Sequence, residues 1–186
     1  MDESRAHLDL SRVLLEGAAF DSTVTSLAEQ IAASVNEELA LVGVRTRGVP
    51  LAQRLQKRIT ELTDAEVPLG ALDITLYRDD VFQGLSIPEV GVTELPFEVE
   101  GRGILLVDDV LYTGRTVRAA LDAIMDFGRP KWIRLVTLVD RGHRELPIRP
   151  DYCGITVETE KDESVEVRLS ELDGDDRVAV FRRKEG

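Results

Sequence analysis

Cysteine, histidine and aromatic residues are scarce in this chain of 186 residues, which has one cysteine, two histidines and 5% aromatic residues. The single Cys153 cannot form a disulfide within the chain. Because the two histidines lie far from it in sequence, no metal-ligand cluster is predicted. No apolar run approaches the roughly 20 residues that cross a bilayer, and the N-terminus lacks a secretory signal pattern. These absences favour a cytoplasmic protein without a membrane segment.

Positive charge is also in the minority. Lys and Arg total 23 against 35 Asp and Glu, a formal net charge of −12, which disfavours indiscriminate binding to nucleic acid. The exception is residues 129–149, where six Lys or Arg meet two acids. Hydrophobic residues make up 43% of the chain, as in a folded globular protein. At this length we expect one domain, residues 1–186.

Strands and helices alternate along most of the chain. Apolar spacing predicts helices at 20–39, after Gly48 and from about Thr116 to Gly128. Buried strands are predicted at 39–44, 104–107 and 132–139, with an extended stretch at 67–77, so the order implies a parallel sheet flanked by helices. The short extended pieces at 154–159, 165–169 and 177–181 are expected to form antiparallel edge strands or a small flap.

Residues 104–117, Ile-Leu-Leu-Val-Asp-Asp-Val-Leu-Tyr-Thr-Gly-Arg-Thr-Val, indicate a site for phosphate and ribose. The backbone N–H groups at a helix start have no partner within the helix, so the turn at Thr113, Gly114 and Thr116 suits a phosphate. Asp108 and Asp109, at the end of a strand, can accept hydrogen bonds from paired ribose hydroxyls. Each residue alone also commonly ends a strand or caps a helix, but their combination favours a binding site.

Three loops leave the carboxyl ends of predicted strands, at 43–48, 108–116 and 140–144. In open α/β sheets, ligands bind at this edge. Because all three loops carry polar or glycine residues, one shared site is predicted there.

Four segments, at 44–52, 72–80, 104–116 and 138–147, together give this chain a resemblance to the type I phosphoribosyltransferases. It is more narrowly similar to the bifunctional pyrimidine operon attenuation regulators and uracil phosphoribosyltransferases. The segments read VRTRGVPLA, LDITLYRDD, ILLVDDVLYTGRT and LVDRGHRELP. The resemblance covers about residues 40–152 and implies an α/β type I phosphoribosyltransferase fold with a small β hood, expected within residues 144–186.

The resemblance also implies a role for each motif. It places the ribose hydroxyls on Asp108 and Asp109, and the ribose phosphate on Tyr112–Thr116. It places the pyrophosphate on the loop Arg45–Gly48, where family members often have a non-proline cis peptide. Residues implied for phosphoribosyl pyrophosphate or uridine monophosphate (UMP) are Arg45, Thr46, Arg47, Gly48, Asp108, Asp109, Tyr112, Thr113, Gly114, Arg115 and Thr116. Those implied to frame the base are Asp140, Arg141, Tyr152 and Val157.

The implied chemistry is displacement of pyrophosphate by a nitrogen of uracil, giving UMP. Mg²⁺ would be held mostly through substrate oxygens, with no direct protein ligand predicted. The catalytic residues implied are Arg78, Asp108 and Asp109, with Arg47 as a further cation. Residues 78–96 would form a flexible lid. Purine enzymes of similar layout have an acid where Tyr112 stands, so Tyr112 favours uracil.

Two alternatives stay open at this stage. Some family members bind pyrimidine-operon messenger RNA when uridine nucleotides are bound, and Arg141, Arg144 and Arg149 are candidates for that contact. Against it, the family's basic stretch after Tyr152 is replaced here by the acidic 153–160. The other alternative is a fold retained only as a nucleotide sensor. In each case the resemblance implies a homo-oligomer, at least a dimer.

Overall fold

The computed structural model describes residues 8–34, 38–79 and 91–184. Its strands are β1 (Leu8–Glu16), β2 (Leu39–Val44), β3 (Leu69–Leu72), β4 (Gly103–Leu111), β5 (Trp132–Asp140), β6 (Tyr152–Thr156), β7 (Glu163–Arg168) and β8 (Arg177–Arg183). Its helices are α1 (Gly17–Ser34), α2 (Gly48–Thr63), the 3-10 helix η2 (Thr75–Tyr77), α3 (Arg115–Met125) and α4 (Ser170–Asp173).

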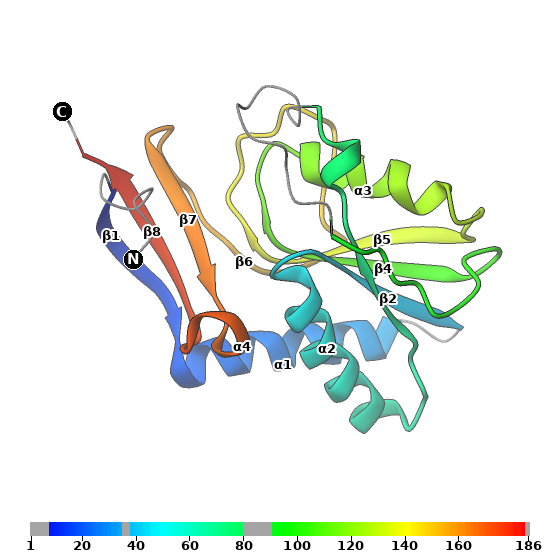
Figure 1. Ribbon diagram of the computed structural model, residues 1–186. Coiled ribbons are helices and arrows are strands. Elements are labelled where there is room, and N and C mark those ends of the chain that lie inside the picture. Colours follow the sequence, from blue (N-terminus) through cyan, green and yellow to red (C-terminus); the bar gives the residue numbers. More distant parts are fainter. Residues whose placement is uncertain (1–7, 35–37, 80–90, 185–186) are drawn as a thin grey trace.

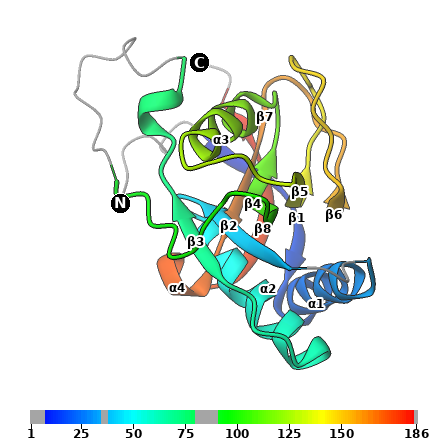
Figure 2. The ribbon, with the colours of Figure 1, turned by 90° about the vertical axis from the view of Figure 1, so that its right-hand side faces the viewer.

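A five-stranded sheet in the order β3-β2-β4-β5-β6 forms the centre of the molecule, and all of its neighbouring strands are parallel. Helices α1 and α2 lie on one face and α3 on the other (Figure 1). The end-on view in Figure 2 separates these three layers. The carboxyl ends of all five strands therefore meet at one edge of the sheet.

A second, antiparallel sheet in the order β1-β8-β7 stands beside this edge and joins the two ends of the described chain. Leu8 pairs with Arg183 and Glu16 with Arg177. We call β1, β7, α4 and β8 the hood. Glu163 at the start of β7 ties the hood strands together, because its buried carboxylate accepts hydrogen bonds from Arg12 of β1 and Arg182 of β8.

The hydrophobic core has one cluster on each face of the central sheet. Phe20, Val24, Leu27 and Ile31 of α1 pack beneath the sheet, and the buried residues of α2 join them. The other cluster contains Ala119, Ala120, Ala123 and Ile124 of α3. Every residue of β2 is buried, as is typical of a strand covered on both faces.

The parallel sheet and its three long helices confirm the predicted α/β fold. One expectation was wrong. β6 pairs in parallel with β5 as an edge strand of the central sheet, whereas an antiparallel strand or flap was expected. β1, which pairs with β8 in the sheet that we call the hood, was also not expected as a strand. No helix in the described parts of the chain is long and apolar enough to span a membrane.

Candidate functional site

A polar cavity of about 410 Å³ lies where β2, β3 and β4 end. Its lining contains seven of the residues predicted from the sequence, together with neighbours on the same loops. The lining residues are Val44, Arg45, Thr46, Arg47, Asp73, Ile74, Thr75, Arg78, Asp108, Asp109, Val110 and Thr116. The predicted edge of the sheet is thus the place where these motifs meet.

Asp108 and Asp109 lie within β4, which runs to Leu111 and is longer than the predicted 104–107. The side chain of Asp108 accepts a hydrogen bond from the Asp109 N–H at 3.0 Å. Burial raises the pKa of Asp108 well above its ordinary value, and the charge of Asp109 raises it further. Burial also raises the pKa of Asp109, although Asp108 and the positive charge of Arg47 oppose this. Both shifts follow from taking two neighbouring carboxylates out of water.

The loop from β2 into α2 forms one wall of the cavity and contains a cis peptide between Arg45 and Thr46, as the family resemblance implied. Gly48 begins α2 against the backbone of β4. A Cβ at Gly48 would lie 2.4 Å from the Val107 carbonyl oxygen, so no larger residue fits. This close approach sets the N-terminus of α2 beside the acid pair.

The side chains of Arg45 and Arg47 leave this loop in different directions. Arg45 donates to the carbonyl of Val92 at 3.0 Å. Arg47 donates to the carboxylate of Asp173 in the hood at 2.9 Å. The loop is therefore held from two sides by segments distant in sequence.

The predicted phosphate turn leads into α3. Gly114 caps the helix with a φ of 93°, a conformation that favours glycine. The Thr113 hydroxyl accepts a hydrogen bond from the Arg115 N–H at 3.3 Å. The guanidinium of Arg115 is turned outward and bridges Asp79 and Glu145 at 2.5 and 2.7 Å. Arg115 thus joins the start of the 78–96 segment to the loop after β5.

The loop after β5 holds Arg141 beside the phosphate turn. Arg141 is only 7% exposed and donates to the carbonyl of Glu163 at 2.6 Å. Burial lowers the pKa of its guanidinium. The Asp140 carboxylate accepts from the N–H of Gly142, and its carbonyl accepts from Val157, which follows β6. Asp140, Arg141 and Val157 are therefore brought together.

Tyr152 is not brought to these residues. It lies at the beginning of β6, opposite Val136, whereas Thr156 at the far end of β6 pairs with Asp140. Its side chain is buried, and its hydroxyl is 2.6 Å from that of Ser34 on α1. Tyr152 is thus a residue of the core beneath the sheet.

The three arginines considered for RNA also differ in position. Arg144 turns inward, where it pairs with Asp140. It donates to the carbonyl of Ile148 in its own loop at 2.9 Å and to that of Tyr112 in the phosphate turn at 2.7 Å. Arg141 is buried beneath the hood, and Arg149 is exposed. The structure therefore does not present the three side chains as one open basic face.

Two acids at the site were not predicted from the sequence. Asp73 follows β3, lines the cavity and accepts hydrogen bonds from the N–H groups of Thr75 and Gly91. Burial alone would raise its pKa, but these hydrogen bonds lower it overall. Asp73 lies at the end of a strand, a signal that could have found it. Asp173 is 126 residues from its partner Arg47, and no local pattern marks it.

Much of the expected lid lies outside the described residues, which omit 80–90. Of its ends, Arg78 lines the cavity, and residues 91–96 follow the edge of the sheet, with Glu94 bridging to Ala71. The described ends of the segment therefore lie beside the site.

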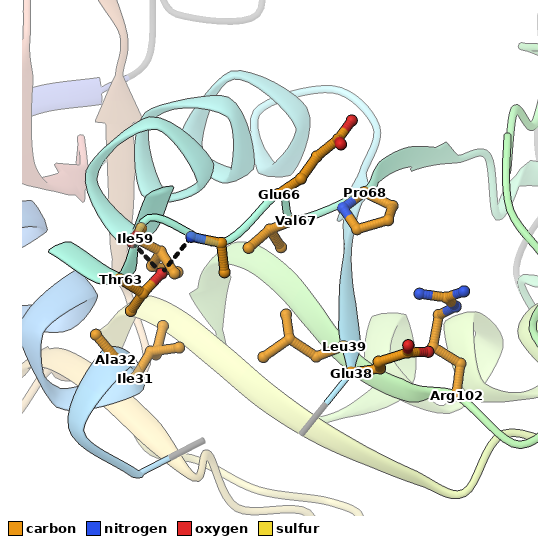
Figure 3. Close-up of a pocket in the computed structure, with 11 residues that line it drawn as sticks. Ile31, Ala32, Glu38, Leu39, Ile59, Thr63, Glu66, Val67, Pro68 and Arg102 are labelled. Carbon is orange, nitrogen blue, oxygen red and sulfur yellow. Dashed lines mark hydrogen bonds between the residues drawn. The ribbon is translucent and has the colours of Figure 1, made fainter. Parts of the chain in front are cut away.

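A larger cavity of about 650 Å³ lies at the opposite, amino edge of the sheet. The side chains of Ile31, Leu39 and Val67 point toward one another there, between the ends of α1 and α2 (Figure 3). The polar side chains that line it are those of Glu38, Thr63, Glu66 and Arg102. Because it lacks convergent polar groups, this cavity does not compete with the one at the carboxyl edge.

The donor set at the carboxyl edge bears on the predicted magnesium. Across the described residues, no group of three or more His, Cys, Asp or Glu could hold a metal ion. The cavity nevertheless presents the carboxylates of Asp73, Asp108 and Asp109. Mg²⁺ is commonly held by one or two carboxylates with substrate phosphates and water. The residues therefore fit an ion carried mainly by substrate oxygens.

Comparison with known proteins agrees with this geometry. The family model described as the phosphoribosyl transferase domain matches residues 13–171. A hypoxanthine phosphoribosyltransferase from Staphylococcus aureus superposes with a TM-score of 0.68 at 22% identity, covering 92% of each chain. One from Trypanosoma cruzi reaches 0.70 at 16% identity, covering 93% of this chain and 92% of that chain. The fold and the site thus define a type I phosphoribosyltransferase.

Relatives of higher identity narrow this class. The bifunctional protein PyrR of Pelotomaculum thermopropionicum is 60% identical over 147 residues, which cover 79% of this chain and 81% of that protein. The PyrR protein of Halalkalibacterium halodurans is 49% identical over 178 residues, covering 94% and 99%. The chain belongs to the PyrR family of bifunctional proteins.

Proposed function

We propose that this phosphoribosyltransferase makes UMP and pyrophosphate from uracil and phosphoribosyl pyrophosphate. The observation that carries the proposal is the pair of acids on β4, the buried Asp108 and the half-buried Asp109. The pair lies a few residues before Gly114, which caps the N-terminus of α3. This spacing places acceptors for two ribose hydroxyls next to donors for a phosphate.

Each substrate group has a place in this arrangement. Asp108 and Asp109 accept hydrogen bonds from the ribose hydroxyls, and the turn Thr113–Thr116 donates to the ribose phosphate. The pyrophosphate lies against the Arg45–Gly48 loop and the N-terminus of α2. Asp140, Arg141 and Val157 frame the base.

The reaction needs no covalent nucleophile. A uracil nitrogen forms a bond to the anomeric carbon while the bond from that carbon to the pyrophosphate oxygen breaks. The electron pair leaves with pyrophosphate, and the proton of the uracil N–H passes to pyrophosphate or solvent. Positive charge develops on the ribose, close to the carboxylates of Asp108 and Asp109, and negative charge develops on the leaving group, close to Arg47. When bound, Mg²⁺ supplies additional charge neutralisation at the pyrophosphate. Fixed charges at these two places stabilise the transition state.

Arg78 and the segment after it have a protective role in this proposal. Arg78 lines the cavity and stands at the root of the 78–96 lid. Closure of a lid over the activated sugar would exclude water, which otherwise competes with uracil.

Tyr112 supports a pyrimidine over a purine. It occupies the position where purine enzymes of similar layout have an acid. It is 40% exposed and has no carboxylate to exchange a proton with an imidazole ring. Uracil lacks that ring, so it does not need the acid.

A second activity is proposed from family membership. The relatives are described as bifunctional, and the corresponding role would be UMP-responsive binding of pyrimidine-operon messenger RNA. Of the arginines considered for it, Arg149 is the exposed one. A binding constant that falls steeply with added salt would support this activity. The proposal also includes a cytoplasmic location and a homo-oligomer, at least a dimer, which analytical ultracentrifugation would test.

The deciding experiment measures UMP formation from uracil and phosphoribosyl pyrophosphate with Mg²⁺. Parallel reactions contain hypoxanthine, guanine or orotate in place of uracil. Turnover with uracil alone is the expected result. Turnover with a purine base would contradict the argument from Tyr112. No turnover with any base would contradict the enzymatic proposal and favour a nucleotide sensor.

A further inference from the structure

Arg47 stands between the acid pair and the hood. One of its Nη atoms donates to Oδ1 of Asp173 at 2.9 Å, and its charge reaches Asp109, whose pKa it lowers. Its Nε is buried and has no hydrogen-bond partner among the described residues. A buried N–H without a partner is unfavourable, and the Arg47 side chain as a whole is 30% exposed. Its exposed N–H groups can therefore donate to a ligand oxygen.

Asp173 is held firmly enough to orient this guanidinium. Its other carboxylate oxygen accepts from the Leu169 N–H at 3.0 Å, and its carbonyl accepts from Arg168 at 2.8 Å. Its side chain is 13% exposed. Burial alone would raise its pKa, but the hydrogen bonds from Leu169 and Arg47 lower it overall, so it carries a negative charge at neutral pH.

We propose that Asp173 is a positioning residue, which fixes Arg47 so that its remaining N–H groups face the pyrophosphate of the substrate. This inference rests on the proposed function. An arginine has five N–H donors in one plane, so fixing one side of the guanidinium fixes the direction of the others. The hood thereby contributes to the pyrophosphate site through a residue that touches no substrate.

A purely structural ion pair between hood and loop would use the same contact. The two roles differ in what they affect. UMP contains the ribose phosphate and the base but no pyrophosphate. A positioning role therefore predicts a selective loss for ligands that carry pyrophosphate, whereas a structural role predicts a loss for all ligands.

The test compares Asp173→Asn with Asp175→Asn, a matched control on the same hood turn. Asp175 pairs with Arg168 and Arg177 and not with Arg47, so the control removes the same charge two residues away. We expect Asp173→Asn to raise the KM for phosphoribosyl pyrophosphate and the inhibition constant of inorganic pyrophosphate about tenfold. The Kd of UMP, measured by calorimetry, should stay within about twofold, and Asp175→Asn should change none of these.

A double-variant cycle supplies the second readout. In an Arg47→Gln background, Asp173→Asn should have no further effect on pyrophosphate affinity, because its partner is already gone. An additional effect of similar size would overturn the inference. So would an equal loss of UMP and pyrophosphate binding, or wild-type behaviour of Asp173→Asn. If the wild-type protein turns over no base, the proposed function fails, and calorimetry with Mg²⁺-pyrophosphate still decides the role of Asp173.

Discussion

The guanidinium of Arg141 lies 4.1 Å from the centre of the Tyr112 ring. His143 meets the same ring edge-on at 5.9 Å, so a residue of the phosphate turn is held by the loop after β5. A cation above an aromatic face is stabilised most where water is excluded, and Arg141 is almost completely buried. The ring therefore orients Arg141 beside the predicted base site.

Tyr112→Leu should raise the KM for uracil about tenfold, because Arg141 loses the aromatic face beneath it. Tyr112→Phe keeps that face and should change the KM by less than about twofold. Steady-state kinetics with uracil varied would measure both. An equal KM for uracil in the two variants would show that the aromatic ring does not position Arg141.

Asp108→Asn should stabilise the folded protein at neutral pH while abolishing most turnover. Because burial raises the pKa of Asp108 in the folded state, its stabilising contribution is complete below the ordinary value near 3.8. That contribution is lost as the pH rises through the raised pKa. The uncharged amide does not titrate. The free energy of unfolding of the variant should therefore increase relative to that of the wild type as the pH rises. Denaturant unfolding across a pH series would measure this, and a constant difference would contradict it.

Gly48→Ala should lower the free energy of unfolding by about 1 to 3 kcal/mol and raise the KM for phosphoribosyl pyrophosphate. The added Cβ would meet the Val107 carbonyl at 2.4 Å, which forces α2 away from β4. Gln53→Ala, on the exposed side of the same helix, is the control and should leave the KM unchanged. Urea unfolding and kinetics together separate the two effects.

Arg144→Ala should disrupt catalysis, although the sequence indicated Arg144 only as a candidate for RNA contact. Its guanidinium organises the loop that contains Asp140, so we expect a several-fold higher KM for uracil. Arg149→Ala changes an exposed arginine and should spare the enzyme. If RNA is bound, only Arg149→Ala should weaken it without loss of uracil turnover, as measured by filter binding at two salt concentrations.

The parts of the fold that were predictable are those with strong local patterns. β2, β4 and β5 are nearly continuous apolar runs, and α2 repeats Leu51, Leu55 and Ile59 on one face. β1 was missed because most of its residues are not buried and its partner strand is at the other end of the chain. β6 was misplaced because parallel neighbours are normally joined through a helix, and the chain between 141 and 151 has none.

The candidate site divides in the same way. Asp108, Asp109 and Thr116 share one motif, so a short sequence was enough to group them. Asp173 becomes relevant only through the hood, and the inward turn of Arg144 depends on carbonyls that a sequence does not place. Residues whose role depends on a contact with a distant part of the chain could therefore be identified only from the structure.

The pairing of β1 with β8 also determines when the enzyme can become complete during its synthesis. β1 is synthesised before the other described strands and β8 after them. The hydrogen bonds of β1 therefore cannot form until residues 177–183 have been made. Arg47 likewise emerges 126 residues before Asp173. The central sheet can assemble before β8 has been synthesised, but the hood closes only after β8 has left the ribosome. A chain truncated before β8 should thus contain every substrate-binding motif and still lack a finished pyrophosphate site.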